Sequence, residues 1–175
     1  NSGVVGPNPE TGQLPPPGTH EIPCRDIILT GQNFTDTNGV VTGAYKPEGV
    51  PATPGEVIPG AVPCGGSILR VNPDGSDMQV AAWGLRNPYG LRFAPTGHPL
   101  AGSLAVSNPQ MDPSPPRPVG GVKDELYLIP NPALATTPTW HGWPDYANGH
   151  PVNDSSVFSP SAALLWRDHP PYVPP

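Results

Sequence analysis

The chain has 175 residues, which is enough for one modest domain or for part of a larger one. Proline supplies 30 residues and glycine 21, which excludes a helical bundle because a proline inside a helix costs about 3 kcal/mol. Eight lysine and arginine residues oppose 14 aspartate and glutamate residues, so we predict no nucleic-acid binding. No apolar run approaches the roughly 18 residues of a membrane-spanning helix.

The first part of the chain is predicted to be mostly loop. Residues 1–23 are rich in glycine, proline and asparagine, and residues 31–63 have a similar composition. Between them, residues 26–30 (DIILT) predict a short strand. The sequence begins at Asn1 rather than at a methionine, so we interpret it as a processed product or as a piece of a longer protein.

The two cysteines, Cys24 and Cys64, predict a disulfide bond. A zinc site would need more nitrogen or sulfur ligands at short spacing, so a disulfide is the preferred interpretation. A pair of free thiols stays open as the alternative. The disulfide would clamp the base of an insertion over residues 25–63 and place the protein in an oxidising, extracytoplasmic compartment, periplasmic or secreted.

The clearest strand pattern begins after the second cysteine. Short runs with strand composition are separated by turn signals, and they cover residues 67–71, 78–83, 90–94, 103–107 and 125–129. The turn Asn72-Pro73-Asp74-Gly75 predicts a hairpin between the first two runs. The first four runs together span about 40 residues, the size of one four-stranded propeller blade.

The end of the chain gives weaker signals. Residues 162–166 fit either a strand or a helical turn, and residues 170–175 predict an extended tail. Four tryptophans argue for an ordered chain, because disordered segments are poor in aromatic residues. The rhythm of short strands is typical of a propeller, a sandwich or a barrel.

Several of these runs resemble one known family. The segments are 64–76 (CGGSILRVNPDGS), 83–91 (WGLRNPYGL), 124–127 (DELY) and 141–145 (HGWPD). Together they resemble the glucose/sorbosone dehydrogenase family, soluble quinoprotein sugar dehydrogenases that are built as six-bladed β-propellers. The family usually has tyrosine at the position of His141. The resemblance covers roughly residues 64–146, and residues 1–6 (NSGVVG) resemble a loop in one branch of the family.

The resemblance implies an all-β chain that forms about two blades of a six-bladed β-propeller, with long loops rich in proline and glycine. We expect a loop-rich segment at 1–63, which includes the insertion clamped by Cys24 and Cys64. A blade region follows at 64–159, and a proline-rich extended tail at 160–175.

The resemblance also implies a cofactor site. Family members bind pyrroloquinoline quinone (PQQ) with a calcium ion beside it. Arg86 and Asn87 match the pair that contacts the quinone, whose carboxylates suit the planar fork of an arginine. Asn108 matches a further site position, and the backbone carbonyls of Pro109 and Gln110 would border the calcium. Pro109 replaces a glycine that is common in the family, so this chain departs from the pattern there.

The general base of the family is missing from the matched segments. It is a histidine that lies upstream of a segment like residues 1–6, and it corresponds to none of His20, His98, His141, His150 and His169. We therefore expect a fragment, inactive alone, of an extracytoplasmic PQQ- and calcium-dependent dehydrogenase that oxidises an aldose at C1 and passes the electrons to an acceptor. Its partners would then include the remaining blades.

A hypothesis of another class stays open beside the enzyme fragment. The chain could be a non-catalytic structural or binding protein derived from a propeller. It would then assemble with copies of itself or with another chain through exposed strand edges.

Overall fold

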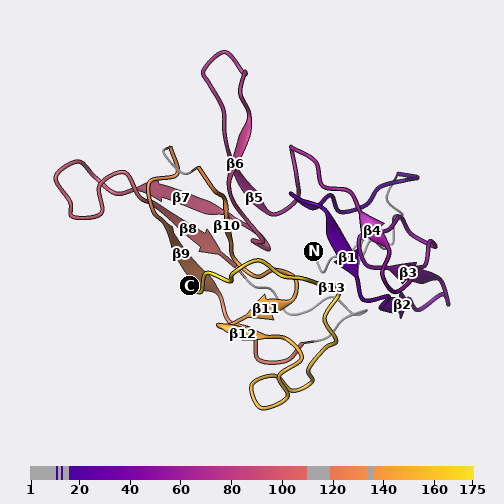
Figure 1. The fold of residues 1–175 in the computed structure, drawn as a ribbon. Helices are drawn as coiled ribbons and strands as arrows, with labels where there is room; N and C mark the ends of the chain where they lie inside the picture. The colour runs from indigo at the N-terminus through magenta and orange to yellow at the C-terminus, as the bar shows by residue number, and fades with distance from the viewer. Residues whose placement is uncertain (1–10, 12, 14–15, 110–118, 134–135) are drawn as a thin grey trace.

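The computed structural model describes residues 11, 13, 16–109, 119–133 and 136–175 (Figure 1). All regular secondary structure within these residues is β-strand, which confirms the predicted all-β class. The strands are β1 (Ile27–Leu29), β2 (Asn33–Thr35), β3 (Val41–Gly43), β4 (Val57–Ile58), β5 (Ser67–Arg70), β6 (Gln79–Trp83), β7 (Gly90–Phe93), β8 (Leu104–Asn108), β9 (Glu125–Ile129), β10 (Thr139–Trp140), β11 (Tyr146–Ala147), β12 (His150–Pro151) and β13 (Trp166–Arg167).

One small sheet joins distant parts of the chain. Its order is β13-β1-β4, and both pairings are antiparallel. Leu29 of β1 pairs with Trp166 of β13, and Ile27 pairs with Ile58 of β4. The predicted strand at 26–30 is confirmed, and in the ambiguous segment at 162–166 the strand starts only at Trp166.

The predicted hairpin at 67–83 is confirmed as β5 and β6. Its turn is closed by the Gly75 amide, which donates to the Asn72 carbonyl oxygen at 2.8 Å. Gly75 has a φ of 86°, a left-handed conformation that glycine adopts without steric cost. The second neighbour of β6 is β10, which runs parallel to it and pairs Trp140 with Trp83.

Strands β7, β8 and β9 form an antiparallel meander. The expectation that the first four runs form one four-stranded blade is wrong, because β5–β6 and β7–β8 belong to different sheets. The reason lies in the third strands: β6 takes β10 as its other neighbour, and β8 takes β9. The sheets of the described residues are small and do not close into a ring.

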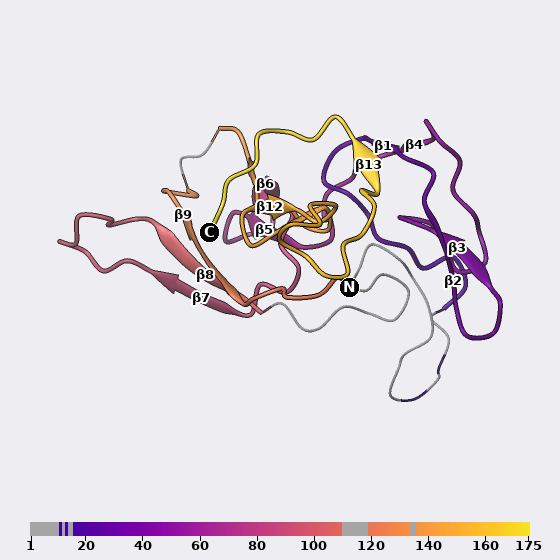
Figure 2. The same ribbon diagram turned by 90° about the horizontal axis from the view of Figure 1, so that it is seen from below.

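Two short hairpins complete the strands: β2 with β3, and β11 with β12. Strands β2, β3 and β4 lie within residues 31–63, which we had predicted to be loop. The β2–β3 hairpin and the β7–β8 hairpin lie at opposite ends of the molecule, as the view from below shows (Figure 2).

The largest hydrophobic core brings together all three segments that the sequence separated. It contains Leu29 from the first segment, Trp83 and Trp140 from the middle, and Leu165 and Trp166 from the tail. The ring centroids of the three tryptophans lie between 5.4 and 6.1 Å apart. The tail is therefore an integral part of this core rather than an appendage.

A second core lies under β5 to β9. Its members include Leu85, Val106 and Tyr127, all with almost no exposed surface. This core fixes the segment between β6 and β7, which carries the residues that the family resemblance selected.

Candidate functional site

The segment after β6 leaves the sheet at a glycine that cannot be replaced without a clash. Gly84 has a φ of 73°, and a Cβ atom added to it would lie 2.5 Å from the indole of Trp140. The next residue, Leu85, is fully buried, and its amide donates to the Gly66 carbonyl oxygen at 2.9 Å. These two residues fix the backbone on which Arg86 stands.

Arg86 lines a cleft, which we call the Arg86 cleft. Its empty volume, the open mouth included, is about 370 Å³. Five parts of the chain form it: residues 21–23, 65–66 and 83–86, together with Tyr45 and Trp143. The walls thus combine aromatic rings with one arginine and one glutamate.

The guanidinium group of Arg86 lies over the ring of Trp143, 5.5 Å from its centroid. This is the geometry of a cation–π contact, which contributes roughly 0.5–1 kcal/mol at an exposed site. Burial lowers the pKa of Arg86, because the cleft solvates its charge less well than water does. Among the described residues no carboxylate forms an ion pair with this guanidinium.

Glu21 brings a carboxyl group to the same cleft. Burial raises the pKa of this carboxyl above its ordinary value, because the charged form is poorly solvated there. No motif pointed to Glu21, which lies 65 positions before Arg86 in a segment with the composition of a loop.

The structure brings Asn87 and Asn108 together. The backbone amide of Asn87 donates to Oδ1 of Asn108 at 2.8 Å, and Nδ2 of Asn108 donates to Oε2 of Glu125 at 3.3 Å. Asn108 is almost completely buried, whereas Asn87 is exposed. Asn108 therefore positions the backbone of the Arg86–Asn87 pair, and its own amide group is turned inward.

A buried polar network lies behind Asn108. Glu125 accepts hydrogen bonds from the Tyr127 hydroxyl and from the Asn148 amide, each at 2.8 Å. Burial, and then the neighbouring Glu125, raise the pKa of Tyr127 far above its ordinary value. The DELY motif predicted the strand but not this network, because Asn108 and Asn148 are distant in sequence.

His141 is held inside the protein by both ring nitrogens. Nδ1 lies 3.2 Å from the Val173 carbonyl oxygen, and Nε2 lies 3.0 Å from Oγ1 of Thr139. Because a carbonyl can only accept, Nδ1 carries the proton and Nε2 accepts from the Thr139 hydroxyl. Burial lowers the pKa of His141 to about 4, so the ring is neutral at pH 7.

The residues expected to border a calcium ion are only partly described. Pro109 follows β8 and is half-buried, whereas Gln110 lies outside the described residues. Within the described ranges no group of three or more histidine, cysteine, aspartate or glutamate side chains could hold a metal ion. Calcium binding through backbone carbonyls stays a prediction.

A second buried carboxylate holds the tail. Asp145 has no exposed surface and accepts the backbone amides of Leu165 at 2.8 Å and of Trp166 at 3.1 Å. Nε2 of His169 lies 3.0 Å from Oδ2 of Asp145. The His169 ring stacks on the Trp140 ring, with the two ring centroids 5.1 Å apart. This pair was not predicted, and its contacts assign it to structure rather than to the Arg86 cleft.

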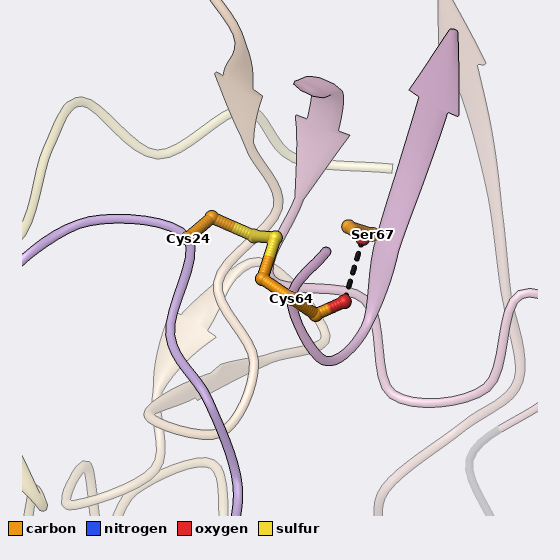
Figure 3. The surroundings of a disulfide bond; sticks show 3 residues. All are labelled: Cys24, Cys64 and Ser67. Carbon is orange, nitrogen blue, oxygen red and sulfur yellow. Dashed lines mark hydrogen bonds between the residues drawn. A yellow bond between two sulfur atoms is a disulfide. The ribbon is translucent and has the colours of Figure 1, made fainter. Parts of the chain in front are cut away.

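The predicted disulfide is confirmed. Cys24 and Cys64 are bonded, with their Cα atoms 5.1 Å apart, and the Ser67 hydroxyl donates to the Cys64 carbonyl oxygen at 2.8 Å (Figure 3). Such a bond is compatible with an oxidising compartment. A helix long and apolar enough to cross a membrane is not found in the part of the chain that the structure describes.

No protein-family model matches the chain, and no curated protein or solved structure matches it.

Proposed function

We propose that the chain is part of an extracytoplasmic PQQ- and calcium-dependent sugar dehydrogenase, in which it contributes one side of the cofactor site. The observation that carries this proposal is Arg86: a cationic side chain, free of carboxylate partners among the described residues, in a cleft with aromatic walls. The disulfide supports the compartment.

The residues of the cleft fit one end of the cofactor. The guanidinium fork of Arg86 can bind one carboxylate in a bidentate manner, and the rings of Trp83 and Trp143 suit a flat aromatic ligand. The exposed side chain of Asn87 is available beside them. Glu21 would oppose an anion when ionised, and its raised pKa reduces that opposition.

In this proposal Arg86 binds and orients, Trp143 supports the guanidinium, and Asn108 holds the backbone of Asn87 in place. A bound quinone supplies the capacity to accept a hydride from C1 of an aldose, with calcium polarising it. The general base and the remaining cofactor contacts would come from blades outside this chain, and the electrons would pass to a separate acceptor.

The test compares two arginine variants in a titration with PQQ and calcium, followed by tryptophan fluorescence. We expect saturable quenching with the wild-type chain and at least a roughly tenfold weaker affinity for Arg86→Met, because a charge-assisted hydrogen bond is lost. Arg92→Met is the matched control, since Arg92 is an exposed residue of β7. Absence of saturable quenching, or equal loss in both variants, would contradict the cofactor role.

The β7–β9 sheet favours a second candidate, a non-catalytic assembly protein. On β9 the side chains of Leu126 and Leu128 are 65% and 42% exposed, while the alternate residues Tyr127 and Ile129 are buried. A sheet face in contact with water normally carries polar side chains, whereas strands that are apolar on both faces are covered on both. This sheet is therefore suited to packing against a further sheet.

Self-association tests this second candidate. We expect the wild-type chain to dimerise or oligomerise with rising concentration, and Leu126→Lys with Leu128→Lys to be monomeric, because charge opposes the burial of that face. Val57→Lys is the control, since Val57 is an exposed apolar residue of another sheet. The measurement is sedimentation equilibrium; a wild-type chain that stays monomeric at high concentration would argue against this candidate.

A further inference from the structure

The disulfide lies directly beside the Arg86 cleft. Residues 21–23, which form one wall, end next to Cys24, and residues 65–66 of the same cleft begin next to Cys64. The S–S bond therefore ties two lining segments together at their bases. Both cysteines are half-buried rather than enclosed in the core, and Cys24 packs against the edge of the largest core.

The insertion between the cysteines is closed by other contacts as well. Ile27 pairs with Ile58 in the β1–β4 ladder, just inside the disulfide. The Gly60 amide donates to Oδ1 of Asp26 at 2.9 Å. The backbones of Gly60 and Arg25 are also in close contact, because a Cβ atom added at Gly60 would lie 2.3 Å from Arg25. The neck of the insertion thus has a closure that does not need the S–S bond.

The cleft wall at 21–23 is held to the segment around Cys64 by two backbone hydrogen bonds. The Ile22 carbonyl accepts from the Gly65 amide at 2.9 Å, and the Pro23 carbonyl accepts from the Ala61 amide at 3.0 Å. The Gly65 donor directly follows Cys64, so its bond depends on the segment that the disulfide holds in register, whereas Ala61 follows Gly60 at the neck. Ile22 is 38% exposed, and Pro23 is buried.

We propose that the Cys24–Cys64 bond is a redox-sensitive tether of this cleft wall: its reduction opens the Arg86 cleft and leaves the aromatic core folded. The reductant is a dithiol. Its thiolate attacks one cysteine sulfur, the S–S bond of the protein breaks, and a second exchange releases both cysteines as thiols. Two electrons and two protons pass to the protein, and the dithiol becomes a disulfide.

Hydrogen–deuterium exchange of the folded chain, with and without dithiothreitol, tests the tether. On reduction we expect the amide of Gly65 to exchange at least about tenfold faster, because local opening no longer meets a covalent restraint. The amide of Leu29, bonded inside the insertion, and that of Leu165, bonded to Asp145, should keep their rates. This readout does not depend on which ligand the cleft binds, so it is separable from the proposed function.

Two results would overturn the tether. Unchanged exchange at Gly65 would mean that the wall is held without the bond. Faster exchange at Leu29 and Leu165 as well would mean that the bond holds the whole fold. Reoxidation should restore the original rates, and the double variant Cys24→Ala with Cys64→Ala should reproduce the reduced pattern; if this variant does not fold, reduction of the folded wild-type chain alone decides.

Discussion

At the scale of single residues, His141 shows how burial fixes a protonation state. His141 is 2% exposed, and both ring nitrogens are held by hydrogen-bond partners inside the protein. A protonated ring would carry an unpaired charge into the core, and this cost is why the pKa falls to about 4.

This burial predicts how stability depends on pH. The unfolded chain binds a proton at His141 near pH 6.5, whereas the folded chain binds it only near pH 4, so the unfolded state gains protons first as the pH falls. The free energy of unfolding should be highest above pH 6.5 and decrease by about 3 kcal/mol towards pH 4. Urea unfolding at several pH values measures it.

The control for this pH dependence is a second histidine. His141→Gln should remove the decrease between pH 6.5 and 4, and His98→Gln, at an exposed turn position, should keep it. A decrease that persists unchanged in His141→Gln would assign the effect to another group.

At the scale of elements, Gly84 joins β6 to the segment of Arg86. Its left-handed backbone and its close approach to Trp140 let β10 run parallel beside β6, where the Trp143 amide donates to the Gly84 carbonyl oxygen at 2.8 Å. The position of Trp143 under Arg86 depends on this junction.

Two glycine substitutions distinguish the steric cost of an added Cβ atom from the cost of backbone strain. Gly84→Ala should lower the free energy of unfolding by about 1–3 kcal/mol more than Gly75→Ala, because overpacking adds to the strain of a left-handed alanine. Gly75 has a similar φ of 86°, but nothing lies within 4 Å of a Cβ added there. Urea unfolding compares the two variants. Equal losses would show that Trp140 moves aside at little cost.

The sequence predicted those elements whose signal is local. Strands β5 to β9 have four or five residues, and turn residues flank them. Strands β4 and β10 have two residues each, which is too short for an alternating pattern, and pairing with distant partners forms them. The parallel pairing of β10 with β6 crosses 57 positions, and no local rule indicates it.

The candidate site shows the same division between features with a local sequence signal and features that depend on distant contacts. A motif selected Arg86 and Asn87, and the disulfide followed from the cysteine count. The contact of Arg86 with Trp143 and the presence of Glu21 depend on tertiary packing of segments that the sequence does not relate. The family resemblance assigned Asn108 to the cofactor site, yet its side chain forms hydrogen bonds with Asn87 and Glu125 of the same chain.

At the scale of the whole molecule, Asp145 joins the tail to the middle of the chain. Its carboxylate accepts two backbone amides from 165–166 and pairs with His169, while β13 pairs with β1. One fully buried side chain thus anchors the strand that completes the sheet of the first segment.

Removing this charge should destabilise the whole fold. Asp145→Asn places an amide NH₂ group against buried N–H donors, and each buried N–H left without an acceptor costs about 1–3 kcal/mol, which a melting curve would detect. Asp168→Asn is the matched control: Asp168 is exposed with a φ of 56°, which asparagine tolerates, so its effect should stay within about 0.5 kcal/mol. Similar melting temperatures for both variants would remove the anchoring role of Asp145.

The pairing of β1 with β13 also determines when folding can finish during synthesis. The hydroxyl of Thr30, next to β1, bonds to the Leu165 carbonyl across 135 positions. At about 5–20 residues per second, a ribosome needs roughly 7–27 s to supply the second partner after the first. Until then Ile27 and Leu29 have no cover from the tail, so slower translation lengthens the interval in which these apolar side chains can promote aggregation.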